Sequence, residues 1–375
     1  MKVDKNLHDK WKEKIISDIG VEKYKQLFFS TNEKINVSPY YSDNKNTIIN
    51  SDKLLFPKEW KIISEIDCNE CENLNIEIKK LYENEIKSII IYNYSGQLID
   101  SSIKTKTNLY FKRDKLVKET SGIKVIVVPK LDTDSLFDLN MACNDNFKLN
   151  ISSEFFKNSG ANIVQEIAFT VCAGIDYINK YGIRLIDKIS FEVFQGGNYF
   201  FEIAKIQALR IIWSIVTKEY GKQIDNCIIT AKPTSLNKTS ENYNNNIVRT
   251  TSECMSAILG GCDFIKSIPY DLKFEEKNEF SERITNNQLL ILKNETSIDH
   301  VINAISGSYY ITYLIDKLAH KSLDLVKKIE NNGGYSNDLR QKGFFKEILL
   351  NKIKDEAKYK SGKKILVGQN KYLND

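Results

Sequence analysis

Short apolar runs alternate with longer segments of helical periodicity along most of the chain after residue 75. The apolar runs are rich in Ile and Val and have the length of strands. We predict strands at residues 88–93, 123–128, 188–193, 226–230, 262–265 and 301–304. We predict helices at residues 163–181, 198–220, 250–259, 283–295 and 311–329. Apolar strands that alternate with helices are typical of a parallel sheet buried on both faces.

This succession of strand–helix units predicts an α/β fold, a TIM (β/α)8 barrel. An open, doubly wound sheet is the alternative. The first predicted strand is not followed by a Gly-x-Gly-x-x-Gly loop, so the dinucleotide-binding form of that alternative is disfavoured.

The segments on either side of the barrel pattern predict two further parts. Residues 1–55 form an arm, with helical spacing at 8–29 and then a polar stretch that suits an extended segment wrapping a partner. Residues 56–335 form the barrel. Residues 336–375 form a tail, with a lysine-rich helix at 337–359.

Composition disfavours nucleic-acid binding and insertion into a membrane. Lys and Arg total 54 and Asp and Glu total 49, a net charge of +5 that is too small to indicate a nucleic-acid binder. The N-terminus is charged, and no apolar run is long enough to span a membrane. The seven cysteines are odd in number and lie mostly in apolar stretches, which indicates reduced thiols. We therefore expect a cytoplasmic protein that binds neither membrane nor nucleic acid.

A few individual residues invite a structural interpretation. The lone pair Cys68 and Cys71 lacks the second pair that a zinc site would need. Glu202, Lys205 and Arg210 lie on an otherwise apolar predicted helix, which favours a buried ion pair or a helix-cap contact over catalysis. Only six arginines are present among many lysines, so each is a candidate for a fixed structural or ligand role.

Four stretches of the chain carry a family resemblance. They are residues 160–169, residues 197–213, residues 243–251 with 259–261, and residues 283–288 with 306–310. In this order and spacing they resemble the barrel domain of methylmalonyl-CoA mutase and its acyl-CoA mutase relatives. The resemblance implies a TIM barrel that threads a CoA ester along its axis. It also implies a flavodoxin-like domain that binds adenosylcobalamin, and a radical reaction that interconverts methylmalonyl-CoA and succinyl-CoA. Some family members are heterodimers of one active and one related inactive chain.

The chain departs from the family pattern where the catalytic histidine is expected. Catalytic chains carry an Arg-Thr-His segment at the end of a barrel strand, and the resemblance implies that its His donates a hydrogen bond to the thioester carbonyl. Counted back from the Asn-Asn-Ile-Val block, that position falls at Thr230, or at Ala231 if the loop is one residue shorter. Neither side chain can replace an imidazole.

A second departure lies before the barrel. Catalytic chains carry a Tyr-x-x-Arg-Pro-Trp-Thr-Ile-Arg segment that contacts substrate. Here Trp60 matches, whereas Leu55 stands for the Tyr, Lys58 for the first Arg and Ile63 for the second. We therefore predict that this chain contributes no catalytic residue.

The cobalamin domain leaves no trace in the sequence. Its mark is Asp-x-His-x-x-Gly, and none of the three histidines, His8, His300 and His320, stands in that setting. We predict that this chain binds no cofactor or metal itself and that adenosylcobalamin belongs to its partner. The favoured hypothesis is an inactive chain that stabilises the large (alpha) catalytic chain of a mutase heterodimer. The alternatives are the substrate-binding chain of a split acyl-CoA mutase and a stand-alone acyl-CoA-binding barrel.

Overall fold

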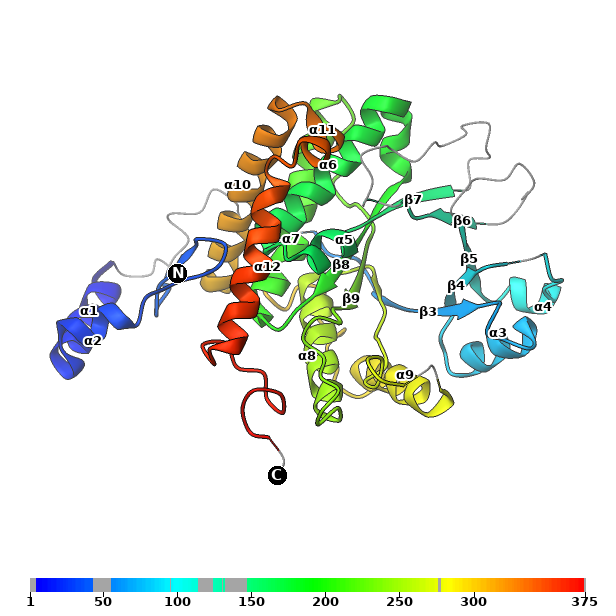
Figure 1. The fold of residues 1–375 in the computed structure, drawn as a ribbon, viewed down its shortest axis with the longest axis horizontal. Coiled ribbons are helices and arrows are strands. Elements are labelled where there is room, and N and C mark those ends of the chain that lie inside the picture. Colours follow the sequence, from blue (N-terminus) through cyan, green and yellow to red (C-terminus); the bar gives the residue numbers. More distant parts are fainter. Residues whose placement is uncertain are drawn as a thin grey trace.

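Eight parallel strands close into a barrel in the order β10-β3-β4-β5-β6-β7-β8-β9 (Figure 1). The structure, a computed structural model, describes residues 5–42, 55–94, 96–113, 124–129, 131, 147–275 and 278–373. The barrel strands are β3 (Lys61–Asp67), β4 (Ser88–Tyr92), β5 (Asn108–Arg113), β6 (Lys124–Val127), β7 (Phe147–Ser152), β8 (Ile189–Gln195), β9 (Ile229–Pro233) and β10 (Phe264–Ile265). The predicted TIM barrel is confirmed, and the open sheet is wrong.

Helices flank the barrel on several sides. Between the barrel strands lie α3 (Leu74–Glu83), α4 (Ser101–Lys104), α5 (Glu154–Ser159), α6 (Ile163–Tyr181), the 3-10 helix η2 (Ile183–Lys188), α7 (Tyr199–Glu219) and α8 (Asn245–Gly260). After β10 come α9 (Glu279–Asn294), α10 (Tyr309–Asn331), α11 (Gly334–Gln341) and α12 (Phe345–Lys360). Within the described ranges, no helix combines the length and apolar character needed to cross a bilayer.

Strand alternation divides the barrel side chains between helices and lumen. Phe191 and Val193 of β8 belong to the main apolar core under the helices, whereas the alternating residues Ser190 and Glu192 take the opposite, inner side. The main core joins the outer faces of the strands to α6, α7 and α10, and α10 packs on both α6 and α7. A smaller core lies under α3.

The N-terminal arm contains two short helices and a hairpin. Helix α1 (Lys5–Ile19) is separated from α2 (Val21–Gln26) by Gly20, whose φ of 83° is accessible to glycine. Strands β1 (Phe29–Ser30) and β2 (Asn36–Val37) then pair antiparallel. Figure 1 shows α1 and α2 standing off from the barrel. The domain boundaries at residues 55 and 335 stay predictions.

Several predicted elements need correction. Residues 301–304 form turns instead of a strand, and Val301 and Ile302 are 60% and 61% exposed. A closed barrel leaves no edge for a further strand. The strand expected at 226–230 begins only at Ile229. Strands β3, β5 and β7 escaped prediction because polar residues interrupt their apolar runs.

The tail helix expected at 337–359 is interrupted. Helix α11 ends before Lys342, which has a positive φ of 52°, and the chain restarts as α12. The Asp338 carboxylate accepts the backbone N–H groups of Phe344 (2.8 Å) and Phe345 (3.0 Å), which satisfies the start of the new helix.

The barrel closes through a short ladder. Strand β10 pairs with β3 only at Phe264–Lys61 and Ile265–Ile62, whereas β3 and β4 pair at five positions. We call the junction of β10 and β3 the seam.

Candidate functional site

Charged side chains from several strands meet at the carboxyl ends of the barrel strands. Glu65 of β3 forms an ion pair with Lys266, which follows β10, and Lys266 also lies 3.5 Å from Glu192 of β8. Tyr92 of β4 donates its hydroxyl proton to Glu65, and the Ser152 hydroxyl of β7 donates to Glu192 at 2.7 Å. We call these five residues the belt. The carboxyl ends of the strands are the usual location of active sites in TIM barrels.

Three belt residues, Glu65, Lys266 and Tyr92, have shifted pKa values. Burial alone would raise the pKa of Glu65, but the Lys266 and Lys232 ammonium charges, with hydrogen bonds from Lys266 and Tyr92, lower it to about 2. Burial opposes the charge of Lys266, yet the Glu65 and Glu192 carboxylates raise its pKa. Burial and the Glu65 charge raise the pKa of Tyr92. Near neutral pH the belt therefore holds a carboxylate, an ammonium and a neutral phenol.

Lys232 of β9 lies beside the belt without joining it. Among the described residues it has no ion pair within 4 Å, and its ammonium lies 5.8 Å from the centre of the Phe194 ring. Burial, followed by the charge of Lys266, lowers its pKa, against the opposing effect of Glu65 and Glu192.

The two residues predicted to stand at the histidine position of the family face opposite ways. In β9, Thr230 pairs with Glu192 and Phe264 and shares the inner side with Lys232. Ala231 is fully buried in the main core, under the helices. Thr230 is therefore the one of the two whose side chain borders the lumen.

The N-terminal substitution positions serve different structural roles. The Leu55 N–H donates to the Gln207 side-chain oxygen (3.3 Å), while the Gln207 amide donates to the carbonyls of Leu55 (3.0 Å) and Gly260 (2.7 Å). Lys58 is exposed. Ile63 is 3% exposed and lines the cavity at the barrel mouth. The structure does not gather these three positions into one site.

A second charged cluster is sealed behind β8. Lys205 lies 3.2 Å from Glu166 and 2.5 Å from Glu202, and it donates to the Phe194 carbonyl at 2.7 Å. Lys157 bridges the same two carboxylates at 3.1 and 3.3 Å. Burial would raise the pKa of Glu166, but the two lysines lower it. The cluster is almost inaccessible to solvent, so it suits structure better than chemistry.

Arg210 completes the ion pairs expected on α7. It is 1% exposed, and its guanidinium lies 2.7 Å from Asp263 and donates to the Gly261 carbonyl at 2.7 Å. It also donates to Asn226 and to the Cys227 carbonyl. The predicted buried ion pairs of Glu202, Lys205 and Arg210 are confirmed.

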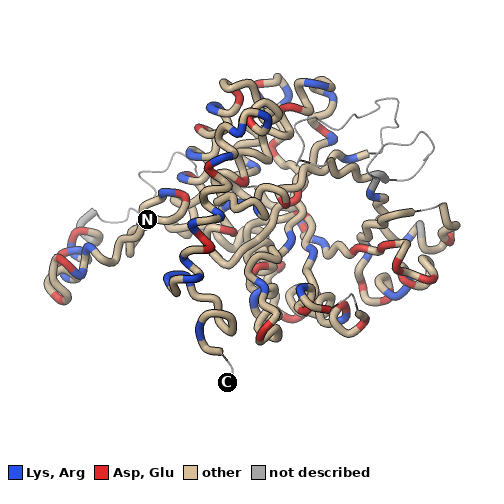
Figure 2. Tube along the Cα trace, viewed as in Figure 1, with Lys and Arg blue, Asp and Glu red and all other residues tan. Residues whose placement is uncertain are grey.

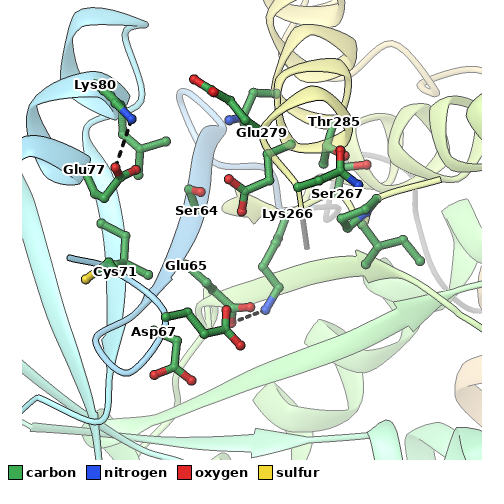
Figure 3. Close-up of a pocket in the computed structure, with 18 of the residues that line it drawn as sticks. Ser64, Glu65, Asp67, Cys71, Glu77, Lys80, Lys266, Ser267, Glu279 and Thr285 are labelled. Atoms are coloured by element: carbon green, nitrogen blue, oxygen red, sulfur yellow. Dashed lines mark hydrogen bonds and ion pairs between the residues drawn. The ribbon is translucent and has the colours of Figure 1, made fainter. Parts of the chain in front are cut away.

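A cavity of about 1270 Å³ opens beside the belt (Figure 3). Its lining includes Glu65, Lys232 and Lys266 at the inner end, and residues of α3 and α9 farther out. Figure 3 shows Ser64 of β3 between these two helices. The cavity therefore reaches from the barrel mouth to the outer side of β3.

The donor groups at the barrel mouth do not suit cobalt ligation. None of the three histidines lines the cavity: His8 lies against Tyr40, His300 is exposed, and His320 contacts the Asp316 carbonyl on α10. Within the described part of the chain, no three His, Cys, Asp or Glu side chains are grouped to hold a metal. No histidine of this chain therefore lies at the cavity, where it could ligate the cobalt of adenosylcobalamin.

Six cysteines are free thiols, and four of them are buried: Cys172, Cys227, Cys254 and Cys262. Cys68 and Cys71 are partly buried, and burial, followed by the neighbouring Cys71, raises the pKa of Cys68 to about 11. Cys143 lies outside the described residues.

Sequence reasoning missed the belt, although part of its signal was present. The run Ile-Ser-Phe-Glu-Val-Phe at 189–194 alternates polar and apolar residues, which marks Glu192 as lumen-facing once a barrel is assumed. Glu65 and Lys266 lie some 200 residues apart in sequence (266 − 65 = 201), and no local pattern joins them.

Comparison with known proteins identifies the family. The family model described as methylmalonyl-CoA mutase matches residues 126–375. The chain belongs to the methylmalonyl-CoA mutase family.

The relatives include both kinds of mutase subunit. The methylmalonyl-CoA mutase small subunit of Porphyromonas gingivalis is 33% identical over 238 residues, 60% of this chain and 38% of that protein. The large subunit of the same organism is 28% identical over 235 residues, 60% of this chain and 33% of that protein. The 2-hydroxyisobutanoyl-CoA mutase large subunit of Aquincola tertiaricarbonis is 27% identical over 237 residues, 60% of this chain and 42% of that protein. The matched part thus spans well under half the length of these relatives.

Proposed function

We propose that this chain is the non-catalytic small subunit of an adenosylcobalamin-dependent methylmalonyl-CoA mutase, and that it stabilises a catalytic large subunit in a heterodimer. The proposal is carried by Thr230, the lumen-facing residue at the position to which the resemblance assigns the catalytic histidine. Loss of one positioned donor to a reacting carbonyl typically lowers the rate by about 10²–10⁴. A threonine hydroxyl can donate a hydrogen bond, but it is shorter than an imidazole and does not titrate near neutral pH, so it cannot act as a general acid.

The belt supports the same conclusion from its protonation states. General acid–base catalysis favours a group whose pKa lies near the working pH. The pKa of Glu65 is about 2, and those of Lys266 and Tyr92 are raised above their ordinary values. These groups hold the strands together at the mouth, and none of them is poised to exchange a proton at neutral pH.

The arm supports a role in assembly. Helix α2 buries none of its residues, and Val21, Phe28 and Phe29 are 51%, 42% and 55% exposed. Two helices of this size with an uncovered apolar surface gain most of their stability from packing on another chain. We infer that the arm wraps a large subunit related to this chain, in a pseudo-symmetric pair.

Adenosylcobalamin supplies the organic radical for the isomerisation when it is bound, and we place it in the large subunit. In this proposal the present barrel supplies surface and stability. The small and large subunits named for Porphyromonas gingivalis show that a related mutase is built from two kinds of chain.

The test is to purify this chain and its large-subunit counterpart separately and after co-expression. We expect no isomerisation of methylmalonyl-CoA by this chain with free adenosylcobalamin, and a higher thermal midpoint for the large subunit in the complex than alone. A matched pair of variants is Trp11→Ala, which removes the aromatic ring stacked on Tyr40 at 4.9 Å in the arm, and the exposed Glu356→Ala of α12. Only the first should weaken association.

Turnover by this chain alone would overturn the proposal. Isomerisation on adding a free-standing cobalamin protein would instead support the split acyl-CoA mutase. Binding of a CoA ester by the isolated chain without either partner would support the stand-alone acyl-CoA-binding barrel.

A further inference from the structure

The outer part of the cavity is a slot between two helices. Figure 3 shows α3 on one side, α9 on the other, and β3 with Ser64 between them. The slot belongs to the cavity of about 1270 Å³, whose lining also includes the Glu65–Lys266 ion pair. We call this outer part the α3–α9 slot.

The slot follows from where the last barrel helices go. In a regular (β/α)8 barrel, the helices after the eighth strand cover the junction with the first. Here α10 packs on α6 and α7, at the other side of the barrel, and α9 packs against α8. Among the described elements, α3 and α9 are the only helices that line the cavity, so part of the outer side of β3 stays uncovered.

The charge of the slot is opposite to that of the chain. The described residues that line the cavity include nine carboxylate residues and three lysines, a formal charge of −6 (3 − 9), whereas the whole chain carries +5. Two of the lysines are already engaged, Lys266 with Glu65 and Lys80 with Glu77. Figure 2 shows acidic residues on α3 and near the start of α9.

The walls of the slot are electrostatically coupled across the gap. Hydrogen bonding and the charge of Glu77 raise the pKa of Lys80 on α3, and Glu279 of α9 adds to that rise. Figure 3 shows Glu279 on the side facing Lys80. Carboxylates of both helices thus favour the charged form of Lys80. Among the described lining residues, carboxylates still outnumber lysines.

Apolar side chains accompany the carboxylates. Ile76 on α3 is 52% exposed and Leu272 after β10 is 47% exposed, and both line the cavity. Their exposed apolar surface lies on the cavity wall, where a bound molecule would cover it. The slot therefore offers both apolar and anionic contacts.

Two ligand classes fit poorly. A bound metal ion would need clustered ligands, and the described residues contain no such group. Coenzyme A carries several phosphate charges, which a lining of −6 repels. A cation carried on an amphipathic peptide segment matches both the charge and the apolar contacts.

We propose that the α3–α9 slot docks a basic, amphipathic segment of the large subunit. Its apolar side chains lie against Ile76 and Leu272, and its Lys or Arg side chains meet Glu72 and Glu279. This inference rests on the proposed function only in that it names the large subunit as the source of the segment.

The first test titrates the full chain with a labelled amphipathic Lys/Leu peptide and a Glu/Leu peptide of the same length, followed by fluorescence anisotropy. The Lys/Leu peptide should bind, and added salt should weaken it. The double variant Glu72→Lys/Glu279→Lys should weaken binding roughly tenfold or more, and the neutral pair Glu72→Gln/Glu279→Gln by a smaller factor. The matched control Glu356→Lys, on exposed α12 outside the cavity, should leave binding unchanged.

The neutral pair guards against a fold defect caused by lysine in the first turn of α9, and thermal midpoints of all variants check this. Equal binding of the two peptides overturns the inference. So do equal affinities of Glu72→Lys/Glu279→Lys and Glu356→Lys, or displacement of the Lys/Leu peptide by a CoA ester.

The second test uses the complex with the large subunit. In a chain whose partly buried Cys68 and Cys71 are replaced by Ser, a photo-crosslinker on Ile76→Cys should label a basic, apolar segment of the large subunit. The same reagent on Ile353→Cys, 63% exposed on α12, should not label that segment. If the complex forms and Ile76→Cys labels no such segment, the slot proposal fails and the proposed function stands. If no complex forms, the proposed function fails, and the peptide titration decides the slot by itself.

Discussion

Replacing Lys266 by Met removes the cation that joins two carboxylates across the barrel mouth. The Lys266 side chain is 7% exposed and contacts Glu65 and Glu192, whose side chains are 27% and 13% exposed. In the variant both carboxylates keep their partial burial but lose their shared counter-charge. Breaking a buried ion pair in this way destabilises a protein by about 3–5 kcal/mol.

The pKa of Glu65 gives an independent magnitude. An ordinary glutamate has a pKa of 4.5, and that of Glu65 is about 2. The difference corresponds to about 3 kcal/mol of stability at neutral pH. Because the pKa is lowered in the folded state, this contribution is complete above pH 4.5 and is lost as the pH falls towards 2. The gap between wild type and Lys266→Met should therefore be largest at pH 7 and narrow below pH 4.5.

The assay is urea unfolding followed by the fluorescence of the buried tryptophans Trp60 and Trp213, from pH 7 down to the lowest pH at which the wild type stays folded. The control is Lys14→Met, which removes an exposed lysine paired with Asp18 at 2.8 Å and should change the unfolding free energy by less than about 0.5 kcal/mol. A Lys266→Met effect no larger than the control, or one that does not vary with pH, would refute the assignment of the belt as a structural ion-pair system.

Three further substitutions test other parts of the fold. Burial raises the pKa of Glu330 to about 7, so the wild type loses stability as the pH rises from 4.5 through 7. The variant Glu330→Gln should therefore have a higher thermal midpoint than the wild type at pH 8. Near pH 5 this difference should disappear. Lys205→Met leaves Lys157 as the one cation shared by the buried carboxylates Glu166 and Glu202, and it should lower the unfolding free energy by about 3–5 kcal/mol, measured in urea. Gly260→Ala places a methyl group 2.8 Å from the Ile203 carbonyl oxygen, where α8 meets α7, and should cost about 1–3 kcal/mol; an unchanged thermal midpoint would contradict the close helix contact.

The elements that sequence predicted best are those whose signal is local. Helix α6 lies at residues 163–181 as expected, because apolar periodicity and the Asn162 cap with Gln165 both mark its start. Strand β4 is a continuous apolar run and was equally visible. Strands with polar residues on their inner side are harder to predict from sequence. Strand β3 reads Lys-Ile-Ile-Ser-Glu-Ile-Asp, and the polar Glu65 within it is explained only by its ion pair with Lys266, which the barrel brings close.

The candidate site divides in the same way. The sequence predicts that Thr230 or Ala231 stands at the histidine position of the family, and the strand register then shows that Thr230, not Ala231, borders the lumen. The acidic slot could not be read in advance, because its walls come from α3 and α9 and meet only through the path of the chain after β10. The strand predicted at 301–304 is wrong because the sequence does not show whether an apolar run is buried. Here Val301 and Ile302 are exposed in the folded chain.

Because the seam is short, we expect the barrel to open locally at the seam more easily than between its other strands. Strand β10 pairs at only two positions on each side, so few backbone hydrogen bonds must break for it to separate from β3. The carboxamide of Gln207 ties Leu55, which precedes β3, to Gly260 at the end of α8. Amide hydrogens of β10 and the first residues of β3 should exchange with solvent faster than those of β8. A partner that covers this junction would slow their exchange without altering any residue of the lumen.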